Sequence, residues 1–144
     1  MRWIFPLLSF IGGIAIAFQA QINGTLGRRA GALEGAFISF AIGALALLFM
    51  VLFFGKGNLG SIFTVPKWQL LGGLLGAFYV SVMVLVVPKI GVAPTLVAVI
   101  AGQLILGAII DHFGLFGGQR FPLDTKKMIA IGLLFCSLFL FNQK

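Results

Sequence analysis

The sequence consists of long apolar runs separated by short polar segments. Residues 36–54, 68–87 and 90–110 form three runs that contain few polar side chains, and each is close to the roughly 20 residues that a helix needs to cross a bilayer core. A run at residues 3–18 reaches that length only if its helix continues through Gln19 to about Asn23.

The last run, residues 128–141, is shorter than the others. As a helix it would be about 21 Å long, so it crosses a bilayer only if flanking lysines at positions 126, 127 and 144 reach the interface with their long stems. The pattern therefore predicts an all-α integral membrane protein with five transmembrane helices in a single domain, residues 1–144. The expected helices cover about residues 3–24, 33–54, 68–87, 90–111 and 126–142.

Two other interpretations of the apolar runs are set aside. Unbroken runs of this length lack the alternation typical of a transmembrane β-barrel. The segment after Arg2 has features of a cleavable signal peptide, but the chain that follows is itself membrane-embedded and needs no separate export signal.

Composition supports a membrane protein, with 60% hydrophobic and 9% charged residues and a mean hydropathy of +1.15. The net charge of +7 comes from basic residues in the short loops, where they set topology and meet anionic lipid. We therefore expect no nucleic-acid partner.

The basic residues divide unevenly between the two sides of a five-helix chain. Six fall on the side of the N-terminus and four on the other: Arg2, Lys56, Lys67, Arg120, Lys126 and Lys127 against Arg28, Arg29, Lys89 and Lys144. Because orientation follows this imbalance, the chain either keeps its N-terminus in the cytoplasm or inserts in both directions. Insertion in both directions would let two copies form an antiparallel pair, like the inverted repeats of many transporters.

Groups suited to covalent chemistry are few. The acids are Glu34, Asp111 and Asp124, the only histidine is His112, and Cys136 stands alone. No nucleophile set, phosphate loop or metal-ligand cluster can be assembled from them at membrane depth. We expect no enzyme activity, and hence no catalytic residue, metal or cofactor.

Uncharged polar side chains lie inside the apolar runs. Gln19 and Asn23 are four residues apart and share a helix face, and each later run adds one or more such groups. Any one of them could simply link two helices by a hydrogen bond. As a set, they are typical of a solute-binding cavity, because unpaired polar groups at membrane depth are costly. The predicted substrate-binding residues are Gln19, Asn23, Ser39, Tyr79 and Gln103.

Asp111 and His112 end the fourth expected helix. An acid beside a group that titrates near neutral pH suits a proton-coupled carrier, so we predict a coupling or gating role for this pair. The alternative is an interfacial helix end in which Asp111 pairs with Arg120 or a neighbouring lysine. Glu34 is expected to compensate the charges of the nearby arginines, and Asp124 to cap the last helix.

Small residues recur at four-residue spacing on the second and third expected helices. Gly35 and Gly43 mark one such ridge, and Gly72 and Gly76 mark another. Ridges of this kind allow helix backbones to approach closely in lipid. We predict that these four glycines are helix-packing residues.

Three segments, QAQINGTLGRRAG, FISFAIGALALL and PKIGVAPTLVAVIAGQLILGAIIDHFG, together resemble the YdcZ-like family of small bacterial membrane proteins. This EamA-like family of putative transporters belongs to the drug/metabolite transporter superfamily. The resemblance implies a five-helix unit that is half of a ten-helix transporter, a dual-topology or paired antiparallel dimer, and a multi-pass location in the bacterial inner membrane.

One departure from related proteins concerns the first helix. The distantly similar small multidrug resistance exporters carry a glutamate there, whereas this chain has no acid between Trp3 and Asn23. Amides in that region favour a neutral, zwitterionic or anionic solute over a bare cation.

The predicted function is therefore a small secondary transporter that moves a small polar or amphipathic solute by alternating access in an antiparallel homodimer. Its partners would be a second copy or a close paralogue and the lipid bilayer. Two alternatives stay open: a small dual-topology ion channel, and a non-transporting membrane subunit.

Overall fold

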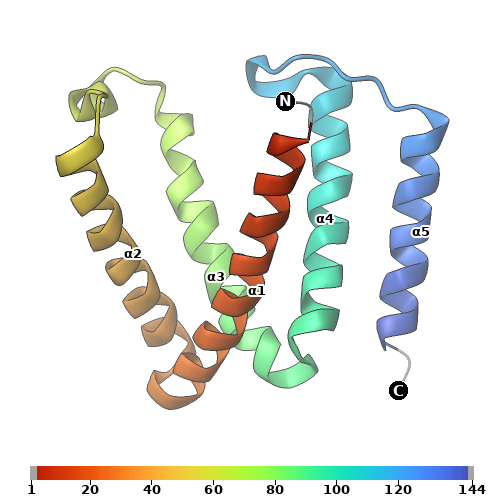
Figure 1. Ribbon diagram of the computed structural model, residues 1–144, viewed down its shortest axis with the longest axis horizontal. Coiled ribbons are helices and arrows are strands. Elements are labelled where there is room, and N and C mark those ends of the chain that lie inside the picture. Colours follow the sequence, from red (N-terminus) through yellow and green to blue (C-terminus); the bar gives the residue numbers. More distant parts are fainter. Residues whose placement is uncertain (1–2, 143–144) are drawn as a thin grey trace. The chain divides into compact units, whose positions relative to one another are not determined.

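The computed structural model describes residues 3–142 and contains no strand within them. Five α-helices follow one another along the chain (Figure 1). Short 3₁₀ segments η1 (Leu59–Phe63) and η2 (Lys67–Leu70) precede α3, and η3 (Leu115–Gly117) follows α4. The α-helices are α1 (Ile4–Ala30), α2 (Ala32–Phe54), α3 (Leu71–Ile90), α4 (Val92–Phe113) and α5 (Thr125–Asn142).

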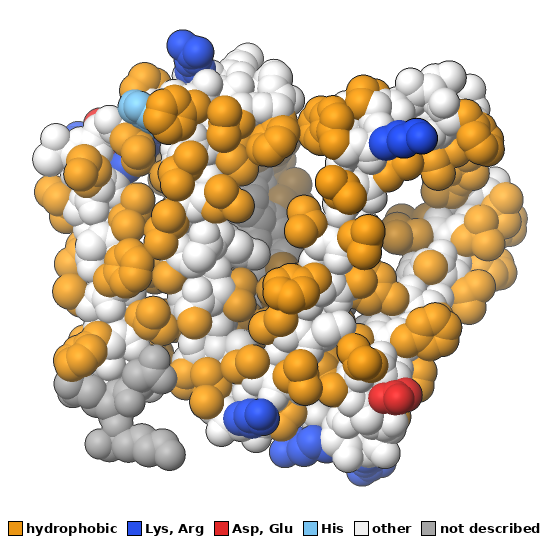
Figure 2. Space-filling view, turned by 180° about the vertical axis from the view of Figure 1, so that it is seen from behind, with side chains coloured by type: hydrophobic (Ala, Val, Ile, Leu, Met, Phe, Trp, Pro, Cys, Tyr) orange, Lys and Arg blue, Asp and Glu red, His pale blue; other side chains and the backbone are white. Residues whose placement is uncertain are grey.

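The first four α-helices are each long and apolar enough to cross a membrane, within the described part of the chain. Figure 2 shows hydrophobic side chains over most of the visible helical surface and Lys or Arg near helix ends. This distribution matches a bilayer solvent, in which apolar surface needs no burial inside the protein. Four of the five predicted spans are thus supported, and the crossing of the membrane by α5 stays a prediction. Arg2 and Lys144, used to predict topology, lie outside the described residues.

Contacts divide the chain into two compact units, one ending at Lys89 and the other beginning at Ile90. The first contains α1, α2 and nearly all of α3, and the second contains α4 and α5. The predicted single domain stays a prediction, and each unit is described by itself below.

The first helix is longer than predicted: it ends at Ala30 rather than near residue 24. Gly24 and Gly27 do not form a turn but lie inside the helix, where a Cβ on either would contact the side chains of Val87 and Val84 of α3. Close packing therefore outweighs the low helix propensity of glycine. The break comes at Gly31, whose φ of +105° is unfavourable for residues with a side chain.

The other helix ends differ from the prediction by smaller amounts. α3 continues through Pro88 to Ile90, and its expected first residues form η2 instead. Gly91, with φ of +90°, separates α3 from α4, which therefore begins at Val92 rather than at residue 90.

Within the first unit, α1 and α2 meet at Gly31 and spread apart towards their other ends (Figure 1). Near the meeting point their backbones touch, because a Cβ on Gly35 would lie only 3.0 Å from the Cα and backbone nitrogen of Gly27. α3 packs against this end through Val84, which is buried with Ala36 and Val80.

The four glycines predicted to pack helices differ in their surroundings. Gly35 packs against the α1 backbone, and a Cβ on Gly76 would lie 3.5 Å from the ring of Phe40. Positions 43 and 72 would place a Cβ in open space, with no atom of the described chain within 4 Å. Gly43 and Gly72 therefore make no close packing contact within the first unit, and their packing role stays a prediction.

Within the second unit, α4 and α5 run antiparallel and are joined by residues 114–124 (Figure 1). Asp124 caps α5 as predicted, because its Oδ1 accepts a hydrogen bond of 2.8 Å from the backbone N–H of Lys127. The carboxylate also complements the positive end of the helix dipole.

Asp124→Ala is expected to lower the free energy of unfolding by about 1 kcal/mol, the usual contribution of an N-cap side chain. Amide hydrogen exchange in the first turn of α5 should become faster while exchange in α2 is unchanged. Asp124→Asn is the matched control, since an asparagine oxygen caps nearly as well. Equal exchange rates in the Ala and Asn variants would contradict the role of the cap.

Candidate functional site

A pocket of about 210 Å³ lies between α1 and α2, on the side of the Gly27–Gly35 contact where the helices separate. It brings together Gln19 and Ser39, two of the predicted substrate-binding residues, and its other lining is apolar: Phe40, Gly43, Ala44 and Leu47. At 1.5 Å per residue, Gln19 is about 18 Å and Ser39 about 12 Å along its helix from Gly31. With Arg28 and Arg29 in the last turn of α1 marking the membrane surface, both side chains lie at membrane depth.

The Ser39 hydroxyl is available to a ligand. Ser9 and Ser81 donate hydrogen bonds of 3.0 and 2.9 Å to the carbonyl oxygens four residues before them, the usual way in which a helix satisfies a hydroxyl in an apolar solvent. Within residues 3–142, neither the Ser39 hydroxyl nor the Gln19 amide has a hydrogen bond. The pocket therefore contains a donor and acceptor set without an internal partner.

Asn23 lies one turn from Gln19 on the same face of α1 and is 4% exposed. Its amide makes no hydrogen bond to any described residue. Every fully buried side-chain polar atom in the described chain does have a partner, so the Asn23 amide keeps a small accessible surface. The Asn23 amide is therefore a further polar group without an internal partner on this face of α1, and its binding role stays a prediction.

Tyr79 is placed differently from Gln19 and Ser39. Its side chain is partly buried against the cluster of Ala36, Val80 and Val84 in the first unit, and it does not line the α1–α2 pocket. Gln103 lies in the second unit. The structure therefore brings together two of the five predicted binding residues in one pocket, and the binding role of all five stays a prediction.

A second pocket, of about 280 Å³, lies between α4 and α5. Gln103 and Asp111, predicted in separate roles, both line it, and Lys127 of α5 faces them. The sequence analysis treated Lys127 as a topology charge and as an interfacial lysine beside the last helix, and did not place it in a binding site. A usable signal was its spacing, since Lys127, Ala130 and Ile131 follow the i, i+3, i+4 pattern of one helix face and all three line the pocket.

His112 holds the loop that follows α4. Its Nδ1 accepts a hydrogen bond of 3.1 Å from the backbone N–H of Leu123, and its ring packs edge-on against Phe113. The observed role of His112 is thus to anchor the loop, and its predicted role in coupling or gating stays a prediction.

Arg120 also binds the end of α4, through a hydrogen bond of 3.2 Å from its Nε to the carbonyl oxygen of Phe113. The alternative ion pair between Asp111 and Arg120 is not formed in the described chain. Asp111 instead binds the loop through its backbone. Its carbonyl oxygen accepts a 2.8 Å hydrogen bond from the backbone N–H of Phe121. The Asp111 carboxylate consequently remains free to face the pocket.

Glu34 lies in the first turn of α2, and its carboxylate sits over Gly31, where a Cβ would overlap it. This position places a negative charge at the positive end of the helix dipole. Glu34 forms no ion pair with Arg28 or Arg29 in the described chain. Its negative charge therefore compensates the positive end of the α2 dipole rather than one arginine through a direct pair.

These helices and pockets define a multi-pass helical membrane protein with polar groups set between apolar helices. The chain belongs to the family described as "Putative inner membrane exporter, YdcZ", which matches residues 4–140. It is also 27% identical over 104 residues to "Inner membrane protein YdcZ" of Escherichia coli (strain K12), a match that covers 70% of each chain. No solved structure gives a significant match.

Family membership confirms the resemblance found in the sequence. It supports a membrane transporter in the inner membrane, and a family of exporters rather than of enzymes. Together with the four apolar helices, it makes the protein a multi-pass inner-membrane protein.

Proposed function

We propose that the protein is a secondary transporter that moves a small polar or amphipathic solute by alternating access in an antiparallel homodimer. The observation that carries this proposal is the α1–α2 pocket, where the Gln19 amide and the Ser39 hydroxyl lie at membrane depth without hydrogen-bond partners. A solute with its own donors and acceptors would satisfy them, and neither group favours a bare cation.

The second copy is supported by what the first unit leaves uncovered. Gly43 lines the pocket, yet it and Gly72 have open space where a Cβ would stand. Small residues of this kind allow a second chain to approach closely in lipid. Two antiparallel copies of a five-helix chain would reproduce an inverted repeat, the arrangement that places a solute site between repeats near the bilayer midplane.

The remaining predicted residues take their places in this proposal as contributors from other helices. Tyr79 and Gln103 would join Gln19, Asn23 and Ser39 in the assembled site, and Asp111 with His112 would couple or gate movement near one mouth. The support for Gln103 and Asp111 is that both line one pocket.

Ser39→Ala is expected to reduce solute efflux at least about tenfold, because a hydrogen bond made to the solute during passage is lost. The measurement uses proteoliposomes loaded with labelled nicotinamide, alanine, lactate or tetraphenylphosphonium, which represent a neutral amide, a zwitterion, an anion and a lipophilic cation. The wild-type protein should give saturable efflux of one of the first three and none of the fourth.

Ser81→Ala is the matched control, since the Ser81 hydroxyl already donates to the carbonyl of Ala77. It should transport normally. Mixing wild-type and Ser39→Ala chains before reconstitution tests the dimer. If two chains share one site, the efflux activity should fall more steeply than in proportion to the fraction of variant chains. Passage of ions at channel rates would favour the channel alternative, and no movement of solute or ion would favour a non-transporting subunit.

A further inference from the structure

The α4–α5 pocket contains two opposite charges that do not neutralise each other. Asp111 in the last turn of α4 and Lys127 in the first turn of α5 both line it. They form no ion pair in the described chain. Unpaired opposite charges on facing walls of one pocket are complementary to a ligand that carries both signs of charge.

Both charged groups have unused capacity for hydrogen bonds. The Asp111 carboxylate accepts none from the described residues. The Lys127 ammonium donates one, of 2.9 Å, to the carbonyl oxygen of Pro122, and an ammonium has three N–H groups. Two donors of Lys127 and both oxygens of Asp111 are therefore available.

The rest of the pocket is suited to a small amphipathic ligand. Leu104, Ala108 and Ile131 provide apolar walls, and the volume of about 280 Å³ is many times what a single water molecule needs. Gln103 lies about 12 Å along α4 from Asp111, eight residues at 1.5 Å. The pocket is thus lined by charged side chains at the helix ends. Deeper in the helical region its lining is apolar, with one amide.

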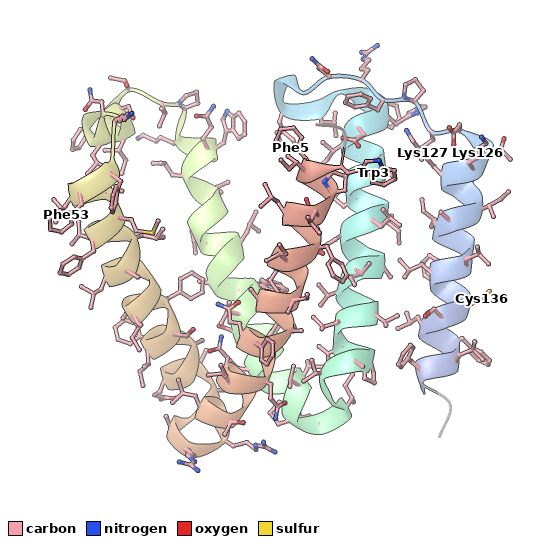
Figure 3. All side chains as sticks on the ribbon, in the orientation of Figure 1. Trp3, Phe5, Phe53, Lys126, Lys127 and Cys136 are labelled. Carbon is pink, nitrogen blue, oxygen red and sulfur yellow. The ribbon has the colours of Figure 1, made fainter. Side chains whose placement is uncertain are left out.

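The charged end of the pocket lies at the level expected for lipid head groups. Lys126 and Lys127 lie in the first turn of α5 (Figure 3), and Arg120 is bound to the end of α4. Clustered basic residues at the end of an apolar helix are typical of the membrane interface. A ligand in the pocket would therefore have its charges in the interface and its apolar part along the helices.

We infer that the α4–α5 pocket binds a zwitterion that carries a primary ammonium and a phosphate, with the ammonium on Asp111 and the phosphate on Lys127. This chemistry is found both in phosphatidylethanolamine and in free phosphoethanolamine. The inference does not rest on the proposed transport, because binding is measured without any flux.

The test is native mass spectrometry of the purified full-length protein with dioleoyl-phosphatidylethanolamine or dioleoyl-phosphatidylglycerol. The wild-type protein should retain the ethanolamine lipid at least about tenfold more strongly, as expected for a charge-assisted contact that the glycerol head group cannot make. Asp111→Asn should abolish this preference and increase binding of the anionic lipid. Lys127→Gln should weaken binding of both lipids.

Lys126→Gln is the matched control, because it removes a lysine from the same helix turn that does not line the pocket. It should bind both lipids as the wild type does. Asp111→Glu and Lys127→Arg keep the charges and should retain the preference, which separates a loss of charge from a loss of folding.

Phosphoethanolamine in solution identifies the source of the ligand. If it competes with the lipid, the pocket takes the free zwitterion as well; if only the lipid binds, the lipid is the ligand. Equal binding of the two lipids by the wild-type protein would overturn the inference, and so would an equal loss in the Lys126→Gln and Lys127→Gln variants.

Discussion

Gly27→Ala is expected to lower the free energy of unfolding by about 1–3 kcal/mol, the usual cost of overpacking a close contact. A Cβ at this position would overlap Val84 of α3. Val84 is only 2% exposed and β-branched, so it has little freedom to rotate away. The added methyl would therefore separate α1 from α3 at the end where α1 and α2 touch. Thermal unfolding in detergent, followed by circular dichroism, measures the loss.

Gly13→Ala is the control for this prediction, because Gly13 lies in the same helix as Gly27 and does not line the α1–α2 pocket. It makes the same change inside a helix, but a Cβ there meets no atom of the described chain within 4 Å, so the higher helix propensity of alanine should leave stability unchanged or slightly raised. Val84→Ala combined with Gly27→Ala should recover part of the loss, as a double-mutant cycle would show. Equal effects of the two single glycine substitutions would contradict a specific contact.

Asn23→Leu is expected to abolish solute transport while leaving the protein as stable as the wild type, or more stable. The Asn23 side chain is 4% exposed and its amide has no partner in the described chain. Leucine has the same number of side-chain non-hydrogen atoms and the same branching at Cγ, so it removes the hydrogen-bonding amide without creating a cavity. A residue that served only to pack helices would tolerate this change with full activity.

The measurement combines efflux from the proteoliposomes described above with thermal unfolding of the same preparation. Gln21→Leu is the matched control, since Gln21 is an exposed amide on another face of α1. It should transport normally. Retained efflux in Asn23→Leu, or a loss of stability that matches the loss of efflux, would remove Asn23 from the proposed site.

The helices could be predicted from the sequence because each contains one unbroken apolar run. The end of α1 could not, because Gly24 and Gly27 are common turn residues and only the packing of Val84 and Val87 against them explains why they remain helical. Local sequence contains no information about that contact. The cap at Asp124, by contrast, depends only on neighbours in the chain and was predicted correctly.

The candidate site was likewise predictable only in part. Gln19 and Ser39 were identified because polar residues are rare inside apolar runs, and they do share a pocket. The position of Asp111 and Lys127 on the walls of one pocket depends on how α4 and α5 align, which the intervening loop determines. The hydrogen bond from Leu123 to His112 is part of that alignment, and residue spacing alone does not reveal it.

The single-residue link at Gly31 has a mechanical consequence for the hairpin. α1 and α2 touch through backbone at Gly27 and Gly35, close to the link, and spread apart beyond it. The contact can therefore act as a fulcrum. With Gln19 about 12 Å along α1 from Gly27, a tilt of about 10° would move its side chain by about 2 Å. A small rocking motion at this hinge would open or narrow the pocket without breaking either helix.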